Sequence, residues 1–185
     1  TDAAISAEML KKALSTDVTH TFNMLSVDGD TSTNDMVTVL ANGMAGNPEI
    51  TCEGEDFTAF MEALNTLTVY LCRSIAADGE GATRMLECEL TGAADVASAR
   101  KIAKSIICSS LVKAAMFGSD ANWGRVLCAI GYSGADVDIS KVDVSFKSVK
   151  GIIDVCKGLS LNDSYWVVPE DFEGSFEQYN LYDNR

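Results

Sequence analysis

The sequence Asp28-Gly29-Asp30-Thr31-Ser32-Thr33-Asn34-Asp35 forms a polar segment, which we call the polar loop. It holds three carboxylates, one amide and three hydroxyls in eight residues. Apolar residues alternate with other residues directly before it, at 22–27, and directly after it, at 36–41. Alternation is typical of β-strands, and paired strands are commonly joined by about two to five residues. The length and polarity of this connection therefore predict a site, or a loop that fixes its own shape, between two strands.

The polar loop has two physical interpretations. A calcium loop of the EF-hand type needs alternating oxygen ligands, a central glycine and a distal glutamate at fixed spacing. Only Asp28 and Asp30 fit the start of that pattern. Alternatively, Asp and Thr side chains hydrogen-bond the backbone amides of their own loop and fix its shape. We predict the second role and no metal site.

Composition indicates an ordinary globular protein of 185 residues, with 47% apolar and 22% charged residues. The net charge of −13 argues against nucleic-acid binding, which needs a basic face. No apolar run is long enough to span a membrane, and no basic-then-apolar leader opens the sequence. We expect one cytoplasmic domain with no membrane contact.

The cysteines predict a reduced protein. Six are present, at positions 52, 72, 88, 108, 128 and 156, and none forms a CxxC pair. His20 is the single histidine and has no cysteine nearby in the sequence, which argues against zinc. Apolar neighbours predict six buried, free thiols rather than a disulfide framework.

The order of elements predicts a layered α+β fold. Ser6 is placed to cap a helix that starts at Ala7, and a long amphipathic helix over 56–77 is expected to end at Gly79 in the left-handed conformation. Further segments have strand or helix periodicity. Strands are expected at the end of 1–5 and over 85–90, 142–146 and 152–155, and helices over 94–108 (continuing through 111–116) and 122–131.

Two further stretches carry candidate side chains. Glu80 lies between two glycines just after the long helix, so its carboxylate is sterically open and suited to an ammonium group; the alternative is a solvated turn residue. In the stretch 118–125, Asp120 or Asn122 is predicted to cap a helix and Trp123 to anchor a core. No Ser-His-Asp arrangement is credible, since His20 has no GxSxG nucleophile elbow to serve.

Several motifs together resemble the β-chain of the ornithine acetyltransferase / glutamate N-acetyltransferase family of arginine biosynthesis. They occur in order over about residues 1 to 155: Thr1-Asp2-Ala3, Phe22-Asn23, Val27 with the polar loop, Ala41-Asn42-Gly43, Asp78-Gly79-Glu80-Gly81-Ala82-Thr83 and Asp120-Ala121-Asn122-Trp123-Gly124-Arg125. The resemblance implies a layered α/β sandwich of that family's type, related to N-terminal-nucleophile folds.

The resemblance also implies an activity. In the family, a precursor cleaves itself before a threonine, whose hydroxyl takes acetyl from N-acetylornithine and passes it to glutamate through an acetyl-enzyme. No cofactor is implied, although some members accept acetyl-CoA as a co-substrate. The implied partners are the α-chain of the same precursor, in an αβ heterodimer that pairs into a heterotetramer.

Site residues follow from the same resemblance. Glu80 matches a substrate-binding glutamate, and Asn180 lies in a loosely similar Tyr-Asn context. In the polar loop, Asp28, Asp30, Thr31, Asn34 and Asp35 are expected to shape the site rather than to react.

The sequence departs from the family pattern at both ends. Thr1 matches a later threonine of the first strand, so we expect the nucleophile upstream of Thr1 and no catalytic residue in this chain. The tail lacks the family's Gly-rich ending, and Arg185 stands where a hydroxyl is expected. We therefore predict a core over 1–157, a divergent or truncated acidic tail over 158–185, and an inactive isolated chain. The alternative is a non-catalytic binding or structural module that retains the fold.

Overall fold

The computed structural model describes residues 1–30, 33–158 and 178–180. The chain divides into two compact units, Thr1–Asp78 (unit 1) and Gly79–Arg185 (unit 2). The predicted boundary between residues 157 and 158 stays a prediction, because most of the tail lies outside the described residues. The division after Asp78 was not predicted from the sequence.

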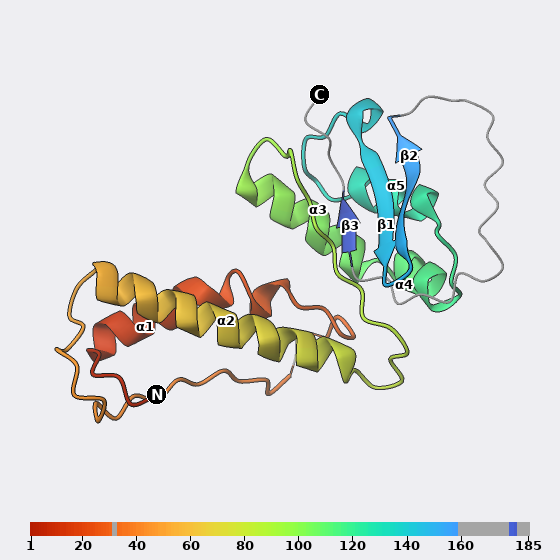
Figure 1. The fold of residues 1–185 in the computed structure, drawn as a ribbon. Coiled ribbons are helices and arrows are strands. Elements are labelled where there is room, and N and C mark those ends of the chain that lie inside the picture. Colours follow the sequence, from red (N-terminus) through yellow and green to blue (C-terminus); the bar gives the residue numbers. More distant parts are fainter. Residues whose placement is uncertain (31–32, 159–177, 181–185) are drawn as a thin grey trace. The chain divides into compact units, whose positions relative to one another are not determined.

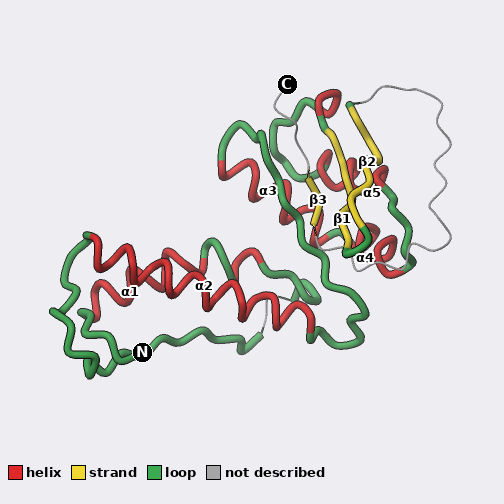
Figure 2. Tube along the Cα trace, viewed as in Figure 1, coloured by secondary structure: helices red, strands yellow, loops and turns green. Residues whose placement is uncertain are grey.

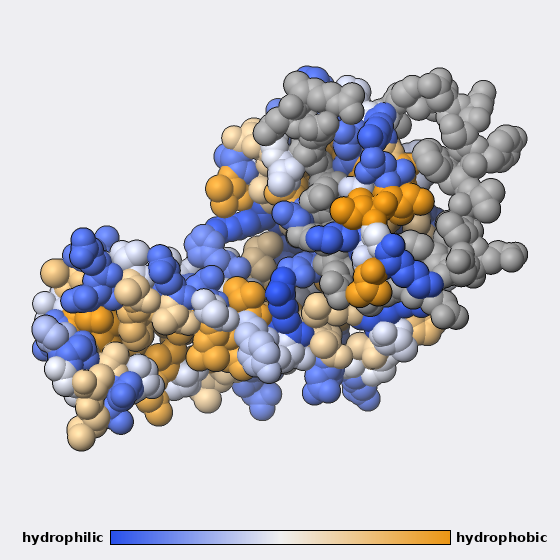
Figure 3. Space-filling model, in the orientation of Figure 1, coloured by the Kyte–Doolittle hydropathy of each residue, from blue (hydrophilic) through white to orange (hydrophobic). Residues whose placement is uncertain are grey.

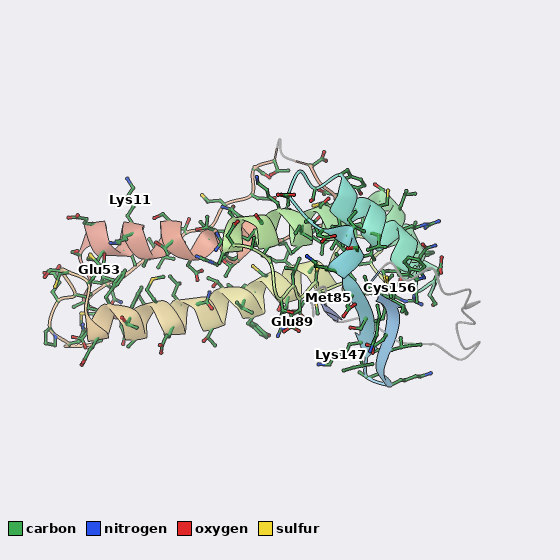
Figure 4. The ribbon with its side chains drawn as sticks, turned by 90° about the horizontal axis from the view of Figure 1, so that it is seen from above. Lys11, Glu53, Met85, Glu89, Lys147 and Cys156 are labelled. Atoms are coloured by element: carbon green, nitrogen blue, oxygen red, sulfur yellow. The ribbon has the colours of Figure 1, made fainter. Side chains whose placement is uncertain are left out.

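Unit 1 is built on two helices, α1 (Ala7–Val18) and α2 (Glu55–Ala77). The backbone N–H of Met9 donates to the side chain of Ser6, which confirms the predicted cap. The helices run side by side in the same direction, because Lys12 pairs with Glu53 just before α2 and later contacts also connect α1 to α2. Their apolar faces meet in a small core of Met9, Ala13, Ile50, Phe57 and Leu64. In Figure 4, Lys11 projects from α1 away from α2, whereas Glu53 lies next to α1 at the start of α2.

The N-terminal segment of unit 1 is tied to residues 40–50. Ile5 forms an isolated parallel bridge with Ile50. The Asn47 amide donates to the Ala4 carbonyl at 3.1 Å and accepts from the Ala4 N–H at 2.8 Å. The nitrogen of Thr1 donates to the Leu40 carbonyl at 2.8 Å. Backbone and side-chain bonds together hold this segment, so the expected strand end at 1–5 is reduced to a single bridge.

The strands predicted on either side of the polar loop do not form within the described residues. Residues Phe22–Met24 form a 3-10 helix, η1, and the stretch from there to α2 is drawn almost entirely as loop (Figure 2). Over 36–41 the alternation is present, but the side chains of Met36 and Leu40 are 84% and 76% exposed. A strand needs a continuous ladder to a neighbouring backbone, and alternation alone does not supply one.

The end of α2 also differs from the prediction. The Asp78 N–H closes the last turn on Ser74 at 3.0 Å, and positive φ occurs at Gly81 (+71°) rather than at Gly79. The left-handed residue therefore comes two positions later than expected, inside a turn that the Ala82 N–H closes on the Gly79 carbonyl at 2.8 Å.

Unit 2 packs three helices against a small antiparallel sheet (Figure 1). The helices are α3 (Val96–Cys108), α4 (Ser110–Phe117) and α5 (Trp123–Gly131), followed by a short 3-10 helix, η2 (Ile139–Lys141). The strands β1 (Asp143–Ser148), β2 (Gly151–Lys157) and β3 (Gln178–Asn180) lie in the order β2-β1-β3. The helices expected over 94–108 and 122–131 and the β1–β2 pair are confirmed. The first of these helices does not continue through 111–116, because Ser109 takes an extended conformation, ends α3 and caps the separate helix α4.

The core of unit 2 lies between the helices and one face of the sheet. Val144, Phe146 and Ser148 alternate as the buried residues of β1, and the first two meet Ile102 and Ile106 of α3. The outer side of the hairpin retains apolar residues, with Val149 and Ile152 79% and 62% exposed, and Figure 3 shows apolar side chains in this region.

The strand predicted over 85–90 is extended chain with one isolated bridge residue, Glu89. Its alternation is nevertheless real, because Leu86, Cys88 and Leu90 pack against the core of unit 2. Packing on a core is sufficient to select alternating apolar residues without a hydrogen-bonded ladder.

The cysteines are free, but the prediction of six buried thiols is wrong. Cys156 is buried and Cys72 and Cys88 are half-buried, whereas Cys52, Cys108 and Cys128 are exposed. For Cys108 and Cys128, apolar neighbours in the sequence did not indicate burial because those neighbours lie on other faces of α3 and α5. Cys52 lies in the connection before α2. Among the described residues, no helix is both long and apolar enough to cross a membrane.

Candidate functional site

The described part of the polar loop is exposed and partly held by its own side chains. The Asp30 N–H donates to Asp28 Oδ1 at 2.8 Å, and Gly29 has φ of +87°, in the left-handed region. Asp28, Asp30, Asn34 and Asp35 are all exposed, and Thr31 lies outside the described residues. A carboxylate that accepts from the amide two residues later closes a local turn, so Asp28 fixes the entry of the loop.

Metal-ligand geometry is not found around these carboxylates. The described residues contain no group of three or more His, Cys, Asp or Glu side chains arranged to hold a metal ion. Hard cations such as Ca²⁺ take six to eight oxygen ligands, which loop residues pointing into solvent do not bring together.

Glu80 lies in the turn that opens unit 2. Gly81 takes φ of +71°, and an added Cβ at Gly81 would meet no atom within 4 Å, so the turn is open. The side chain of Glu80 is exposed. The geometry agrees with a sterically open carboxylate, which is what a charge-assisted contact to an ammonium group requires. The alternative of a solvated turn residue has the same geometry.

The stretch 118–125 is a helix start. The Arg125 N–H donates to Asn122 Oδ1 at 3.1 Å, and Asn122 Nδ2 donates to Asp120 at 2.9 Å. Trp123 is packed against the core of unit 2. Ser119 has φ of +59°, in the left-handed region, between α4 and this cap. Asn122 is therefore the cap, Asp120 orients it, and the structural interpretation of this stretch is confirmed.

Asn180 is placed by its backbone at the end of β3. It lies opposite Ser145 of β1 in an antiparallel pair. This position and Glu80 belong to unit 2, whereas the polar loop belongs to unit 1. Among these candidates, a hydrogen bond links Asp30 to Asp28 within the polar loop.

One buried polar group was missed in the sequence. Asp17 is 1% exposed, on the α1 face that also buries Met9 and Ala13. Asn65 Nδ2 of α2 donates to Asp17 Oδ1 at 2.8 Å, and Thr21 Oγ1 donates to Asp17 Oδ2 at 3.2 Å. The signal was present: positions 9, 13 and 17 are four residues apart, so an acidic residue at 17 falls on the buried stripe of the helix.

The half-buried thiols are held in the protonated form. Burial raises the pKa of the Cys88 thiol to about 12, and the neighbouring Glu89 charge adds to the effect. Burial and then the Asp17 charge also raise the pKa of Cys72. Because the thiolate is the nucleophile, neither cysteine is prepared for covalent catalysis.

Hydrogen bonds lower the pKa of two carboxylates, Asp95 and Asp138. The Ser98 backbone N–H and then its hydroxyl hold the pKa of Asp95 below its usual range, at the N-cap of α3. The Ser140 hydroxyl and then Lys141 likewise lower the pKa of Asp138. Both carboxylates are accounted for by these local contacts.

These features define an α+β protein with an exposed acidic turn and a polar loop whose entry is fixed by Asp28. Residues 1–164 match the model of the ArgJ family, and the chain belongs to this family. The family resemblance inferred from the motifs is therefore confirmed.

Individual relatives support the same family assignment. An arginine biosynthesis bifunctional protein ArgJ 1 of Clostridium acetobutylicum is 51% identical over 163 residues, covering 88% of this chain and 40% of that protein. A similar protein of Lactiplantibacillus plantarum is 44% identical over 185 residues, covering 100% of this chain and 43% of that protein. The latter alignment includes the tail. The chain thus spans about two fifths of the length of these curated relatives.

The fold prediction is confirmed by a solved structure. The crystal structure of an arginine biosynthesis bifunctional protein argJ from Bacillus halodurans matches with a TM-score of 0.80 at 38% sequence identity. The match covers 97% of this chain and 84% of the crystallised chain. An α+β fold of the family type is therefore established.

Proposed function

We propose that this chain is the β-chain-like part of a glutamate N-acetyltransferase that moves acetyl from N-acetylornithine to glutamate in arginine biosynthesis. The observation that carries the proposal is the family match over residues 1–164. The relatives named above are bifunctional proteins of arginine biosynthesis, which supports the same pathway for this chain.

The proposed reaction has two steps through an acetyl-threonine, whose threonine precedes Thr1 in the longer protein. The threonine hydroxyl attacks the acetyl carbonyl, its proton passes to the departing amine, and the amide C–N bond breaks to release ornithine. The amine of glutamate then attacks the ester, and the threonine hydroxyl is restored. An N-terminal threonine suits this role because its own amine acts as the general base.

Glu80 is proposed to bind an ammonium group of the ornithine substrate. Its exposed carboxylate in an open turn supports this role, since a charge-assisted contact is among the stronger small contacts available. Asn180 is proposed as a second substrate contact from β3. The polar loop, including Asp28, Asp30, Thr31, Asn34 and Asp35, is proposed to shape the region without reacting.

The proposed assembly is an αβ heterodimer that pairs into a heterotetramer, in the cytoplasm, with the α-chain from the same precursor. The proposal requires no cofactor, and acetyl-CoA is included in it only as an alternative acetyl donor. The 185-residue chain alone is proposed to be inactive. Acetyl transfer from N-acetylornithine to glutamate by the purified chain alone would contradict this.

The Glu80→Gln variant of the full-length protein tests the substrate role. A contact to a charged group contributes about 1.5–3 kcal/mol, and each 1.4 kcal/mol is tenfold, so KM for N-acetylornithine should rise by at least about tenfold. The control is Glu49→Gln, an exposed carboxylate of unit 1, which should leave KM unchanged. An unchanged KM in Glu80→Gln would reduce Glu80 to a turn residue. No transfer in the wild-type protein would refute the proposed function itself.

A further inference from the structure

Asn42 and Gly43 form the only Asn-Gly pair of the sequence, and the proposed acetyl transfer gives this pair no role. Both residues are exposed, in the connection between the polar loop and α2. Gly43 takes φ of +70°, a left-handed conformation that glycine adopts without strain. Because glycine has no side chain, nothing keeps its backbone nitrogen away from the preceding asparagine side chain. A reaction between the two residues is therefore sterically open.

The side chain of Asn42 is bonded to the backbone just beyond Gly43. The Met44 N–H donates to Asn42 Oδ1 at 3.1 Å. This bond closes a local turn, and the ring that it closes contains Asn42 Cγ and the Gly43 nitrogen. A donor on Oδ1 also stabilises the negative charge that this oxygen gains when a nucleophile attacks Cγ. The turn thus keeps the Gly43 nitrogen and Asn42 Cγ in one local ring and favours attack on Cγ.

The nitrogen of Gly43 is not protected by a hydrogen bond. Among the hydrogen bonds between described residues, the Gly43 N–H donates none. By contrast, the Asn42 N–H donates to the Thr1 carbonyl at 3.2 Å, and the Ala45 N–H donates to the Asp2 carbonyl at 2.8 Å. A bonded N–H must first break its bond before it can lose its proton, so the unbonded nitrogen is the reactive one.

No other asparagine of the sequence is followed by glycine. Asn47 precedes Pro48, whose nitrogen carries no hydrogen, and its side chain is bonded to Ala4. Asn65 lies inside α2, where backbone N–H groups belong to the helical ladder. Asn122 caps α5 with its side chain. The open nitrogen, the exposed amide and the activating donor occur together at Asn42.

We propose that Asn42 is a site of spontaneous modification in which the backbone of Gly43 is the nucleophile. The Gly43 nitrogen forms a bond to Asn42 Cγ, and the Cγ–Nδ2 bond breaks. The Gly43 proton passes through solvent to the departing nitrogen, which leaves as ammonia, and a cyclic succinimide remains. Water then adds to either ring carbonyl and opens the ring, which gives aspartate or isoaspartate at position 42. The reaction needs no reagent other than water.

The isoaspartate product changes how the N-terminal segment is held. Isoaspartate routes the main chain through Cβ, which lengthens it by a carbon atom between positions 42 and 43. The bonds from Asn42 to Thr1 and from Ala45 to Asp2 lie on opposite sides of that insertion, so at least one of them must change. Residues 1–5 should therefore exchange their backbone hydrogens faster after the modification.

The test incubates the full-length protein that contains this chain in mildly alkaline buffer, which promotes loss of the Gly43 proton. Peptide mass spectrometry measures conversion of each asparagine to the acid, and electron-transfer fragmentation distinguishes isoaspartate from aspartate. Asn42 should convert at least about tenfold faster than any other asparagine of this chain, which corresponds to a barrier lower by about 1.4 kcal/mol. Both products should appear at position 42. Conversion no faster than at the other asparagines, or aspartate without isoaspartate, would overturn the proposal.

Two glycine variants separate the chemistry from backbone strain. Gly43→Ala places a methyl group beside the nucleophilic nitrogen and should slow the conversion at least about tenfold. Gly46→Ala is the matched control, because Gly46 has φ of +74° in the same connection and the Asn-Gly pair stays intact. Its rate at Asn42 should equal that of wild type. Equal rates in the two variants would refute the role of Gly43.

Asn42→Ser decides the question if Gly43→Ala does not fold. Serine cannot form the ring, so hydrogen exchange of residues 1–5 should stay constant during incubation of this variant and rise in wild type. The same rise in Asn42→Ser would refute the proposed modification as its cause. Conversion and exchange are measured rather than acetyl transfer, so the result is independent of the proposed enzymatic function.

Discussion

Replacing Phe146 by alanine should remove much of the stability of unit 2. The side chain is 0% exposed and faces the helices from β1. An aromatic side chain buries about 200 Å², which at about 25 cal/mol per Å² gives an upper value of about 5 kcal/mol. Measured Phe→Ala changes in cores are about 3–5 kcal/mol. With a urea dependence of about 2 kcal/mol per M, the unfolding midpoint should fall by about 2 M.

Fluorescence of Trp123 reports on this transition, because Trp123 packs against the same core. The second tryptophan, Trp166, is replaced by Phe in all variants so that one signal remains. The matched control is Ile152→Ala on β2, where the side chain is 62% exposed. That change should alter the free energy of unfolding by no more than about 0.5 kcal/mol.

The ratio of the two effects tests the assigned faces of the hairpin. A loss below about 1 kcal/mol in Phe146→Ala would show that Phe146 is not in the core. If Ile152→Ala lowered the free energy of unfolding more than Phe146→Ala, the buried face of the hairpin would be the one that carries Ile152. The face assigned here would then be wrong.

Three further predictions concern single residues. The lowered pKa of Asp95 means that its cap stabilises α3 fully above the ordinary Asp pKa of about 4, and that this contribution is lost as pH falls through the lower folded pKa. The urea midpoints of wild type and Asp95→Ala should therefore differ at pH 7 and converge as pH falls below that folded pKa, and a constant difference would refute the assignment. Cys88, with a pKa of about 12, should react with iodoacetamide at pH 8 far more slowly than exposed Cys52, as peptide mass spectrometry would show, and equal rates would contradict its burial. Gly81→Ala should cost about 1–2 kcal/mol from backbone strain alone, because φ is +71° and no atom crowds the added methyl; thermal unfolding measures it, and a neutral change would show that the turn adopts another conformation.

Local sequence patterns predicted the elements whose stability is local. Ser6 as a cap located the start of α1, and the apolar spacing over 56–77 located both ends of α2 to within a residue, because capping and helical periodicity act between near neighbours. The strands β1 and β2 were found for a related reason, since they form a hairpin with a short connection. In each case the partner of the pattern lies close in sequence.

The wrong predictions of strands and of the end of α2 have a different cause. Residues 36–41 and 85–90 alternate as strands do, yet a ladder depends on a second backbone that no local pattern specifies. The shift of positive φ from Gly79 to Gly81 is a choice between two glycines that the sequence does not distinguish.

For the candidate site, the residues alone predicted an open carboxylate at Glu80, and the structure agrees with an exposed turn. Its binding role came only from the resemblance and stays a prediction. Asp17 was overlooked because its acidic side chain suggested a surface position, although its spacing from Met9 placed it on the buried face. The polarity of Asp17 indicated an exposed side chain, whereas its position on the helix indicated a buried one. The position predicted its burial correctly.

Several contacts join residues that precede the polar loop to residues that follow it. Ala4 is held to Asn47, Ile5 to Ile50, Lys12 to Glu53 and Asp17 to Asn65, so α1 is anchored to α2 at several levels. The described residues of the polar loop are exposed, and exposed loops are where chains tolerate cleavage best. A single cut within 28–35 would therefore leave two fragments that remain associated as a noncovalent complex, and unit 1 would keep its two-helix pairing without an intact covalent connection between the helices.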